Sequence, residues 1–296
     1  MNNRSHRSFL SRILYSPDER RLRAGWRLAL HYSLIFILLI IASIPLVFVI
    51  SPQELISSER GQVLNGLVSI FAFTGSVYIA RRWLDQRSLI SLGLEWDGKA
   101  WRELIFGVVI NGLMIGLVFA IEWALGWLQF EAFAWQTQPV SSVVRGTALM
   151  LVTFIMIGWG EELLSRGYWL QNLKDGLNMK WAVPLSSAAF ALLHWTNPNY
   201  SWRASGGLFL AGLILAYGYV RTDRLWLPIG MHIGWNFFEG TVFGFTVSGT
   251  QSFHLIEHNV VGPEIWTGGA FGPEAGLVQL PALVLGVLLI WLYTKK

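Results

Sequence analysis

Hydrophobic residues in this chain come in long blocks, not at the spacing of an amphipathic helix or a strand. Residues 28–50 contain no Lys, Arg, Asp or Glu. A helix needs about 20 mostly apolar residues to cross the hydrocarbon of a bilayer. This block therefore predicts a membrane-spanning helix. Neither its length nor the 27 residues ahead of it fit a cleavable signal peptide.

The other apolar blocks extend this pattern to eight spans. The predicted spans are residues 28–50, 62–80, 104–126, 146–165, 181–197, 205–220, 225–246 and 277–293. They predict an all-α integral membrane protein, a bundle of about eight transmembrane helices with a polar intramembrane cavity, folded as a single multi-pass domain over residues 1–296. The connections are short except for residues 247–276, a Gly-rich segment. Gly112 and Gly116 have the spacing of helices that pack closely.

The basic residues test this arrangement. With the N-terminus and every second connection assigned to the cytoplasm, the inside segments hold 19 of the 22 Lys and Arg residues. The outside segments keep only Arg60, Arg145 and Arg203. Cytoplasmic loops of membrane proteins carry such an excess of positive charge. The pattern predicts a protein of the cell (inner or plasma) membrane with both termini in the cytoplasm.

Composition adds exclusions. Charged residues make up 14% of the chain, against about 25% in soluble proteins. The arginines that give the net charge of +4 lie where membrane topology would put them, so we predict no nucleic-acid partner. The chain has no cysteine. That excludes a disulfide, a thiolate nucleophile and a cysteine-based metal site.

Charged residues inside the predicted spans indicate where chemistry could occur, because each costs at least ~2.5–3.5 kcal/mol to insert. The first group is Glu161, Glu162 and Arg166, at the end of the fourth span. Glu162 and Arg166 are four apart, acid first, which favours an ion pair on one helix face. Glu161 lies about 100° around the helix, so it is expected to stay free to act as a base. The alternative is a helix end where both acids reach water.

Two further groups follow in later spans. Phe190 and His194 share one face deep in the fifth span, where a lone histidine is usually a packing residue. His232 and Asn236 point the same way on the seventh span. Both can donate hydrogen bonds to a developing oxyanion, although polar contacts between helices are the alternative. Glu239 lies on the same face as His232, either beside a site or toward outside water.

Together these groups provide a carboxylate base, an imidazole and two oxyanion donors, the set that a water-activating hydrolase needs. Zinc is an alternative, because Glu161, His194 and His232 could supply its three protein ligands. A second zinc candidate is the H-x-x-E-H pattern from His254 to His258. Nearby Gly and Pro residues favour a loop there, whereas the motif needs a helix. We predict no metal and no cofactor.

Three motifs carry a resemblance to a known family. Glu161–Arg166 reads EExxxR, Phe190–His194 reads FxxxH and His232–Asn236 reads HxxxN, in that order on membrane helices. This set resembles the CAAX protease and bacteriocin-processing family (CPBP, or Abi), which includes the type II CAAX prenyl endopeptidases. The resembling core spans residues 146–246.

The resemblance implies a metal-independent glutamic intramembrane endopeptidase. Glu161 and His194 would activate water, and His232 and Asn236 would hold the oxyanion. Glu162, Arg166 and Phe190 would support them. The implied substrate is a membrane-embedded or lipid-anchored peptide in the bilayer.

The alternative is a non-catalytic immunity or scaffold protein, or a small transporter, that uses the same polar residues. The lack of paired internal repeats disfavours a transporter. An acid–His–His–Asn set is also an unfavourable means of holding helices together, because ionisable residues cost free energy to insert into a membrane.

Overall fold

The structure is a computed structural model that describes residues 9–16 and 21–295. Arg4, Arg7, Arg20 and Lys296, which count toward the predicted topology, lie outside the described residues. The elements up to the middle of the chain are α1 (Phe9–Leu14), α2 (Ala24–Ser43), η1 (Ile44–Phe48), α3 (Pro52–Ser57), α4 (Glu59–Trp83), η2 (Ile90–Leu92), α5 (Gly98–Ala124), β1 (Leu128–Phe133) and α6 (Ala134–Thr137). The remaining elements are α7 (Val140–Glu162), η3 (Leu163–Trp169), α8 (Leu170–Gly176), α9 (Met179–Leu193), α10 (Trp202–Thr222), α11 (Trp226–Asn236), η4 (Phe237–Val242), β2 (Ile256–Val260), α12 (Glu264–Thr267), η5 (Gly269–Phe271), η6 (Pro273–Ala275) and α13 (Gln279–Thr294).

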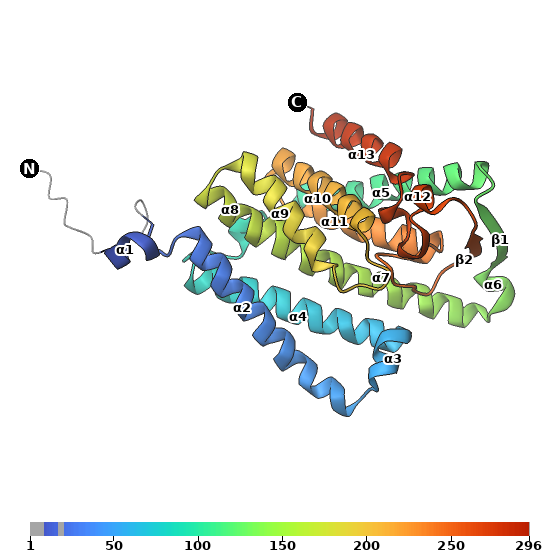
Figure 1. The fold of residues 1–296 in the computed structure, drawn as a ribbon, viewed down its shortest axis with the longest axis horizontal. Coiled ribbons are helices and arrows are strands. Elements are labelled where there is room, and N and C mark those ends of the chain that lie inside the picture. Colours follow the sequence, from blue (N-terminus) through green and yellow to red (C-terminus); the bar gives the residue numbers. More distant parts are fainter. Residues whose placement is uncertain (1–8, 17–20, 296) are drawn as a thin grey trace, which may run out of the picture.

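The described residues form a helical bundle, and the predicted all-α integral membrane class is confirmed (Figure 1). Five of the described helices are long and apolar enough to cross a bilayer: α2 with η1, α4, α5, the continuous helix of 140–176, and α10. Two shorter apolar helices, α9 and α13, accompany them. Each of the eight predicted spans coincides with a helix, the seventh with α11 and η4.

Two predicted boundaries are wrong at positions that matter for the site. The fourth predicted span ends at 165, but the helix continues to Gly176. The fifth predicted span runs to 197, but α9 ends at Leu193 and His194 is its C-terminal cap. His194 therefore lies at a helix end, followed by a loop, and not deep within a helix. The prediction ran past Leu193 because hydropathy does not detect a helix end.

Both helices that carry the acids and the HxxxN motif change to a π-helix directly after those residues. The π-helix η3 follows Glu161 and Glu162, and η4 follows Asn236. π-Turns within α-helices are frequent at functional sites. The two π-helices therefore lie directly beside the EExxxR and HxxxN motif residues.

Helix α11 is held against α5 by glycines. A Cβ added at Gly230 would lie 2.1 Å from the carbonyl oxygen of Leu104, and one at Gly234 would lie 2.7 Å from that of Val108. The two backbones therefore touch only because side chains are absent. The pair predicted from its spacing, Gly112 and Gly116, does not pack against a helix backbone. These two glycines instead face aromatic rings of the chain after α11.

The long connection 247–276 was predicted as a loop, and in part this is wrong. Residues 256–260 form β2, which pairs antiparallel with β1. The rest folds back on the bundle, at the end where β1 and α6 lie (Figure 1). Gly272, with φ of 104°, permits one of these close approaches, since a Cβ there would lie 2.0 Å from the Thr246 carbonyl oxygen. The small sheet is the departure from a purely helical fold.

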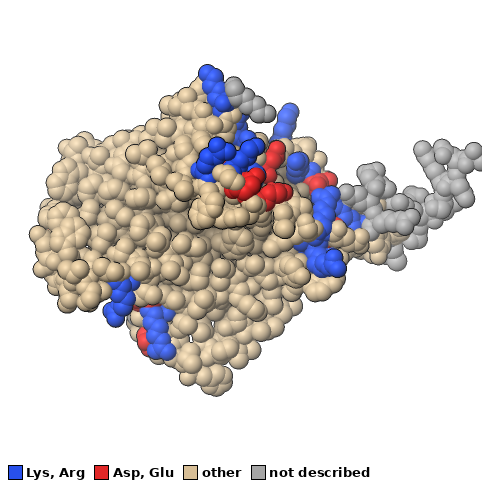
Figure 2. Space-filling model, turned by 180° about the vertical axis from the view of Figure 1, so that it is seen from behind, with Lys and Arg blue, Asp and Glu red and all other residues tan. Residues whose placement is uncertain are grey.

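Charged side chains gather away from a broad uncharged surface. On the face in Figure 2, Lys and Arg lie mainly on one part of the molecule, with a smaller group beyond a wide area that bears no charge. Ion pairs join segments predicted to share the cytoplasmic side: Arg27 with Asp85 at 2.7 Å, and Arg224 with Asp97 at 2.8 Å. These segments therefore lie together, as a membrane topology requires. Which side of the bilayer they face stays a prediction.

Candidate active site

Glu162 and Arg166 form a fully buried ion pair. The Nη1 of Arg166 donates to Glu162 Oε1 at 2.8 Å, and both side chains have no exposed surface. Arg166 Nη2 also donates to the carbonyl oxygen of Gly212 at 3.0 Å. Its guanidinium lies 4.3 Å from the centre of the Phe190 ring, a cation–π contact. The alternative in which both acids reach water is excluded for Glu162.

The same carboxylate orients His232. The ring Nδ1 of His232 lies 2.8 Å from Glu162 Oε1. Because an ionised carboxylate only accepts, the hydrogen bond comes from Nδ1–H. The other ring nitrogen, Nε2, is then directed away from Glu162 and lies 3.9 Å from Glu161 Oε2. Glu162 thus links the EExxxR and HxxxN motifs.

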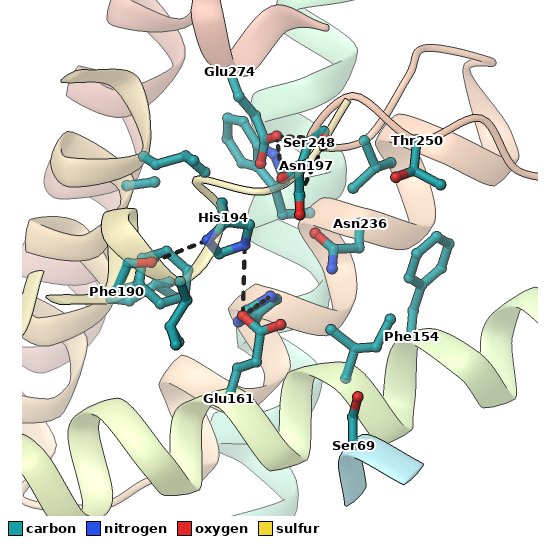
Figure 3. Close-up of a pocket in the computed structure, with 18 of the residues that line it drawn as sticks. Ser69, Phe154, Glu161, Phe190, His194, Asn197, Asn236, Ser248, Thr250 and Glu274 are labelled. Carbon is teal, nitrogen blue, oxygen red and sulfur yellow. Dashed lines mark hydrogen bonds and ion pairs between the residues drawn. The ribbon is translucent and has the colours of Figure 1, made fainter. Parts of the chain in front are cut away.

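Glu161 and His194 face each other across a short gap. The Nε2 of His194 lies 3.8 Å from Glu161 Oε2, and the two side chains are 12% and 18% exposed. The Nδ1 of His194 lies 3.0 Å from the carbonyl oxygen of Phe190. A carbonyl oxygen accepts, so Nδ1 carries a proton and Nε2 points toward Glu161. Figure 3 shows this pair, joined by a dashed line, with Asn236 to its right.

The four predicted catalytic residues line one cavity. It has a volume of about 1000 Å³, and Glu161, His194, His232 and Asn236 all lie on its wall. Of the three predicted supporting residues, Phe190 also lines it, and its ring packs edge-on against both histidines. The other two, Glu162 and Arg166, lie behind the wall.

Among the polar residues of the cavity that the sequence motifs do not include, three are joined by hydrogen bonds: Asn197, Ser248 and Glu274. All three line the cavity. The backbone N–H and the hydroxyl of Ser248 donate to Glu274 Oε2 at 2.7 and 2.6 Å. Asn197 Nδ2 donates to the Ser248 carbonyl oxygen at 3.0 Å. Glu274 lies in a Gly-rich connection, where an acid is usually solvated. The residues around it therefore do not indicate that its side chain is buried.

Glu274 lies in η6, outside the membrane-spanning helices, and is 5% exposed. Burial raises the pKa of its carboxyl above the usual value. The Ser248 hydrogen bonds and the nearby His194 and His232 act in the opposite direction and offset part of this rise.

The remaining candidates lie apart from the cavity wall. Glu239 is fully buried, so it does not reach outside water. His258 lies on β2 with Nε2 at 2.8 Å from the Phe243 carbonyl oxygen, and Glu257 accepts a hydrogen bond from Thr137. The H-x-x-E-H pattern therefore runs into a strand, not the helix that its metal chemistry needs. In the part of the chain described, no three His, Asp or Glu side chains are grouped so that they could hold a metal ion.

Comparison with known proteins places this site in a family. Residues 143–238 match the family model described as type II CAAX prenyl endopeptidase Rce1-like. The chain is also 25% identical over 181 residues to "Putative membrane peptidase YdiL" of Bacillus subtilis (strain 168), covering 60% of this chain and 71% of the relative. No solved structure matches the chain significantly.

The matched segment runs from α7 to the start of η4, so it contains all seven residues of the three motifs. It also contains the π-turn η3 and the end of α9. The predicted family is therefore confirmed. Residues 143–238 of this multi-pass membrane protein are a domain of the Rce1-like type II CAAX prenyl endopeptidase family.

Proposed function

We propose that this protein is an intramembrane glutamic endopeptidase that hydrolyses a peptide bond in a membrane-embedded or lipid-anchored substrate. One observation carries the proposal. The Nε2 atoms of His194 and His232 lie 3.8 and 3.9 Å from the same oxygen, Oε2 of Glu161. These distances are too long for direct hydrogen bonds. They suit a water molecule that contacts all three groups at once.

In the proposed reaction Glu161 acts as the general base. It takes a proton from that water while the water oxygen attacks the carbonyl carbon of the substrate. His194 positions the water through Nε2, because its Nδ1 is engaged by the Phe190 carbonyl oxygen. No metal ion takes part in this scheme.

Asn236 and His232 are proposed to hold the oxyanion of the tetrahedral intermediate. Asn236 supplies an amide N–H from the cavity wall. His232 can donate through Nε2 only in its doubly protonated form, since Nδ1–H is directed to Glu162. This role therefore requires the imidazolium next to the carboxylates of Glu161 and Glu162.

The supporting residues would fix this geometry. Arg166 occupies Glu162, so Glu162 orients His232 and does not compete with Glu161 as a base. The centre of the Phe190 ring lies 5.0 Å from that of His194 and 5.9 Å from that of His232. One side chain therefore restricts the orientation of both imidazole rings.

The apolar side chains in the cavity wall favour an apolar substrate. Besides the polar residues, the walls include Tyr32, Phe36 and Leu39 of α2, and Phe73 of α4. Tyr32 and Phe36 are also half-exposed on the outer surface of the bundle. A cavity with such walls at membrane depth suits a hydrophobic peptide or a lipid-modified chain.

We further propose that the protein lies in the cell membrane with both termini in the cytoplasm.

The experiment is cleavage in liposomes. The purified full-length protein is reconstituted with a library of membrane peptides that includes lipid-modified ones, and products are identified by mass spectrometry. We expect cleavage by the parent and by a matched control, Glu131→Gln, whose side chain is exposed on β1. We expect Glu161→Gln to cleave at least about 100-fold more slowly, the usual range for loss of a general base. A parent that cleaves no peptide, with Glu161→Gln still active in cells, would favour the non-catalytic alternative.

A further inference from the structure

A third carboxylate faces the cavity from the side opposite Glu161. In Figure 3, Glu274 lies above His194 while Glu161 lies below it, with Asn236 beside the space between them. Glu274 belongs to η6, outside the segment matched by the family model. It is therefore not one of the motif residues.

The fold holds Glu274 firmly in this position. Its Oε2 accepts both Ser248 donors, and its backbone carbonyl oxygen accepts from Gln279 Nε2 at 2.5 Å. Its backbone also packs directly on α10, since a Cβ added at Gly207 would lie 1.7 Å from the Glu274 carbonyl oxygen. A side chain so fixed is preorganised, as a catalytic group must be.

A structural role does not account for an acid at this position. Burying a carboxylate is costly unless a cation or several hydrogen bonds compensate it. Among the described residues, Glu274 forms no ion pair with Lys or Arg, and both hydrogen bonds to its side chain reach Oε2. A glutamine would accept the same two bonds from Ser248 through its amide oxygen. The second oxygen, Oε1, takes part in no hydrogen bond among the described residues, and the side chain lines the cavity.

We propose that Glu274 is a second catalytic carboxyl group, which donates a proton to the nitrogen of the leaving amine. This inference rests on the proposed peptidase function. Water loses one proton to Glu161 as its oxygen bonds to the carbonyl carbon. The C–N bond then breaks, and the nitrogen takes the proton of the Glu274 carboxyl. The proton on Glu161 afterwards returns to Glu274 through water, so the net reaction consumes one peptide bond and one water.

The surroundings of Glu274 favour the protonated form that this step needs. Burial raises the pKa of its carboxyl above the usual value. His194 and His232 face it from α9 and α11 and oppose the rise. A raised pKa keeps the carboxyl neutral to higher pH, and a neutral carboxyl can act as a general acid. Activity should therefore fall on the alkaline side as Glu274 loses its proton.

The test compares two leaving groups in the liposome assay. Glu274→Gln is assayed on a cleaved peptide and on the matching nitrophenyl ester, whose leaving group departs without a proton. We expect a loss of at least about 100-fold on the peptide, in the range of general acid catalysis. On the ester we expect a loss of less than about 10-fold, because the oxyanion donors and the base remain. The control Glu264→Gln changes an exposed acid of the same connection and should leave both rates unchanged.

A second variant separates proton donation from folding. Ser248→Ala removes the hydroxyl that stabilises the ionised form of Glu274, so the alkaline limb of the pH–rate profile should move to higher pH. Equal losses on peptide and ester for Glu274→Gln, or an alkaline limb unmoved by Ser248→Ala, would overturn the proposal. A parent that cleaves neither substrate would instead overturn the proposed function.

Discussion

Arg166 connects more parts of the site than any motif spacing suggests. It neutralises Glu162, reaches the backbone of α10 at Gly212 and lies over the Phe190 ring. The Glu162–Arg166 contact could be predicted from sequence because both residues lie on one helix, four apart. The Glu162–His232 contact could not, because it joins residues 70 positions apart. Glu274 was missed for the same reason, since only the folded connection brings it to the cavity.

Replacing Arg166 should therefore destabilise the protein. Arg166→Ala leaves Glu162 as an uncompensated buried charge, and breaking such a pair costs about 3–5 kcal/mol. Unfolding in detergent, followed by circular dichroism, measures this loss. Arg145→Ala, a change at an exposed arginine in the same long helix, serves as the control. A matched stability for both variants would show that the buried pair adds little to the fold.

Helices were easier to predict than the contacts between them. Each long apolar block coincides with a helix, and five of the described helices are long and apolar enough to cross a bilayer. The close approach of α5 and α11 involves Gly230 and Gly234. From spacing, close helix packing was predicted at Gly112 and Gly116 instead. Spacing alone does not reveal which glycine faces a backbone. Strand β2 and the π-turns η3 and η4 likewise depend on tertiary packing and gave no local signal.

The packing of α11 on α5 should be sensitive to one methyl group. Gly230→Ala places a Cβ against the Leu104 carbonyl oxygen, and we expect a loss of about 1–3 kcal/mol, as for overpacked cores. It should also slow cleavage, because α11 positions His232 and Asn236. Gly206→Ala is the matched control, since nothing lies within 4 Å of its added Cβ on α10. Thermal unfolding and cleavage rates check both variants, and equal behaviour would contradict this account of the interface.

At the scale of the whole molecule, basic residues predicted an arrangement that the ion pairs support. Arg21 and Arg27 of the N-terminal segment contact Asp175 and Asp85, each from a different segment predicted to be inside. The rule behind the prediction acts on whole loops, so it tolerates errors of several residues in helix ends. It cannot place the connection 247–276, whose fold depends on glycine turns and buried polar contacts.

Orientation is testable directly, because the chain has no native cysteine. Glu131→Cys and Lys99→Cys place single thiols at exposed positions near opposite ends of the bundle. In intact cells, a membrane-impermeant maleimide should label the first variant, while the second should react only after permeabilisation. The reverse pattern would show that the N- and C-termini face outward.

The proposed role of Glu161 as the general base can be tested in one assay. The cleavage rate of an identified peptide is measured in liposomes for the parent, Glu161→Gln and Glu131→Gln, each with and without a zinc chelator. We expect equal rates for parent and control, no effect of the chelator, and a loss of at least about 100-fold for Glu161→Gln. Cleavage by Glu161→Gln at the parent rate would contradict this role. So would activity that the chelator abolishes and added zinc restores.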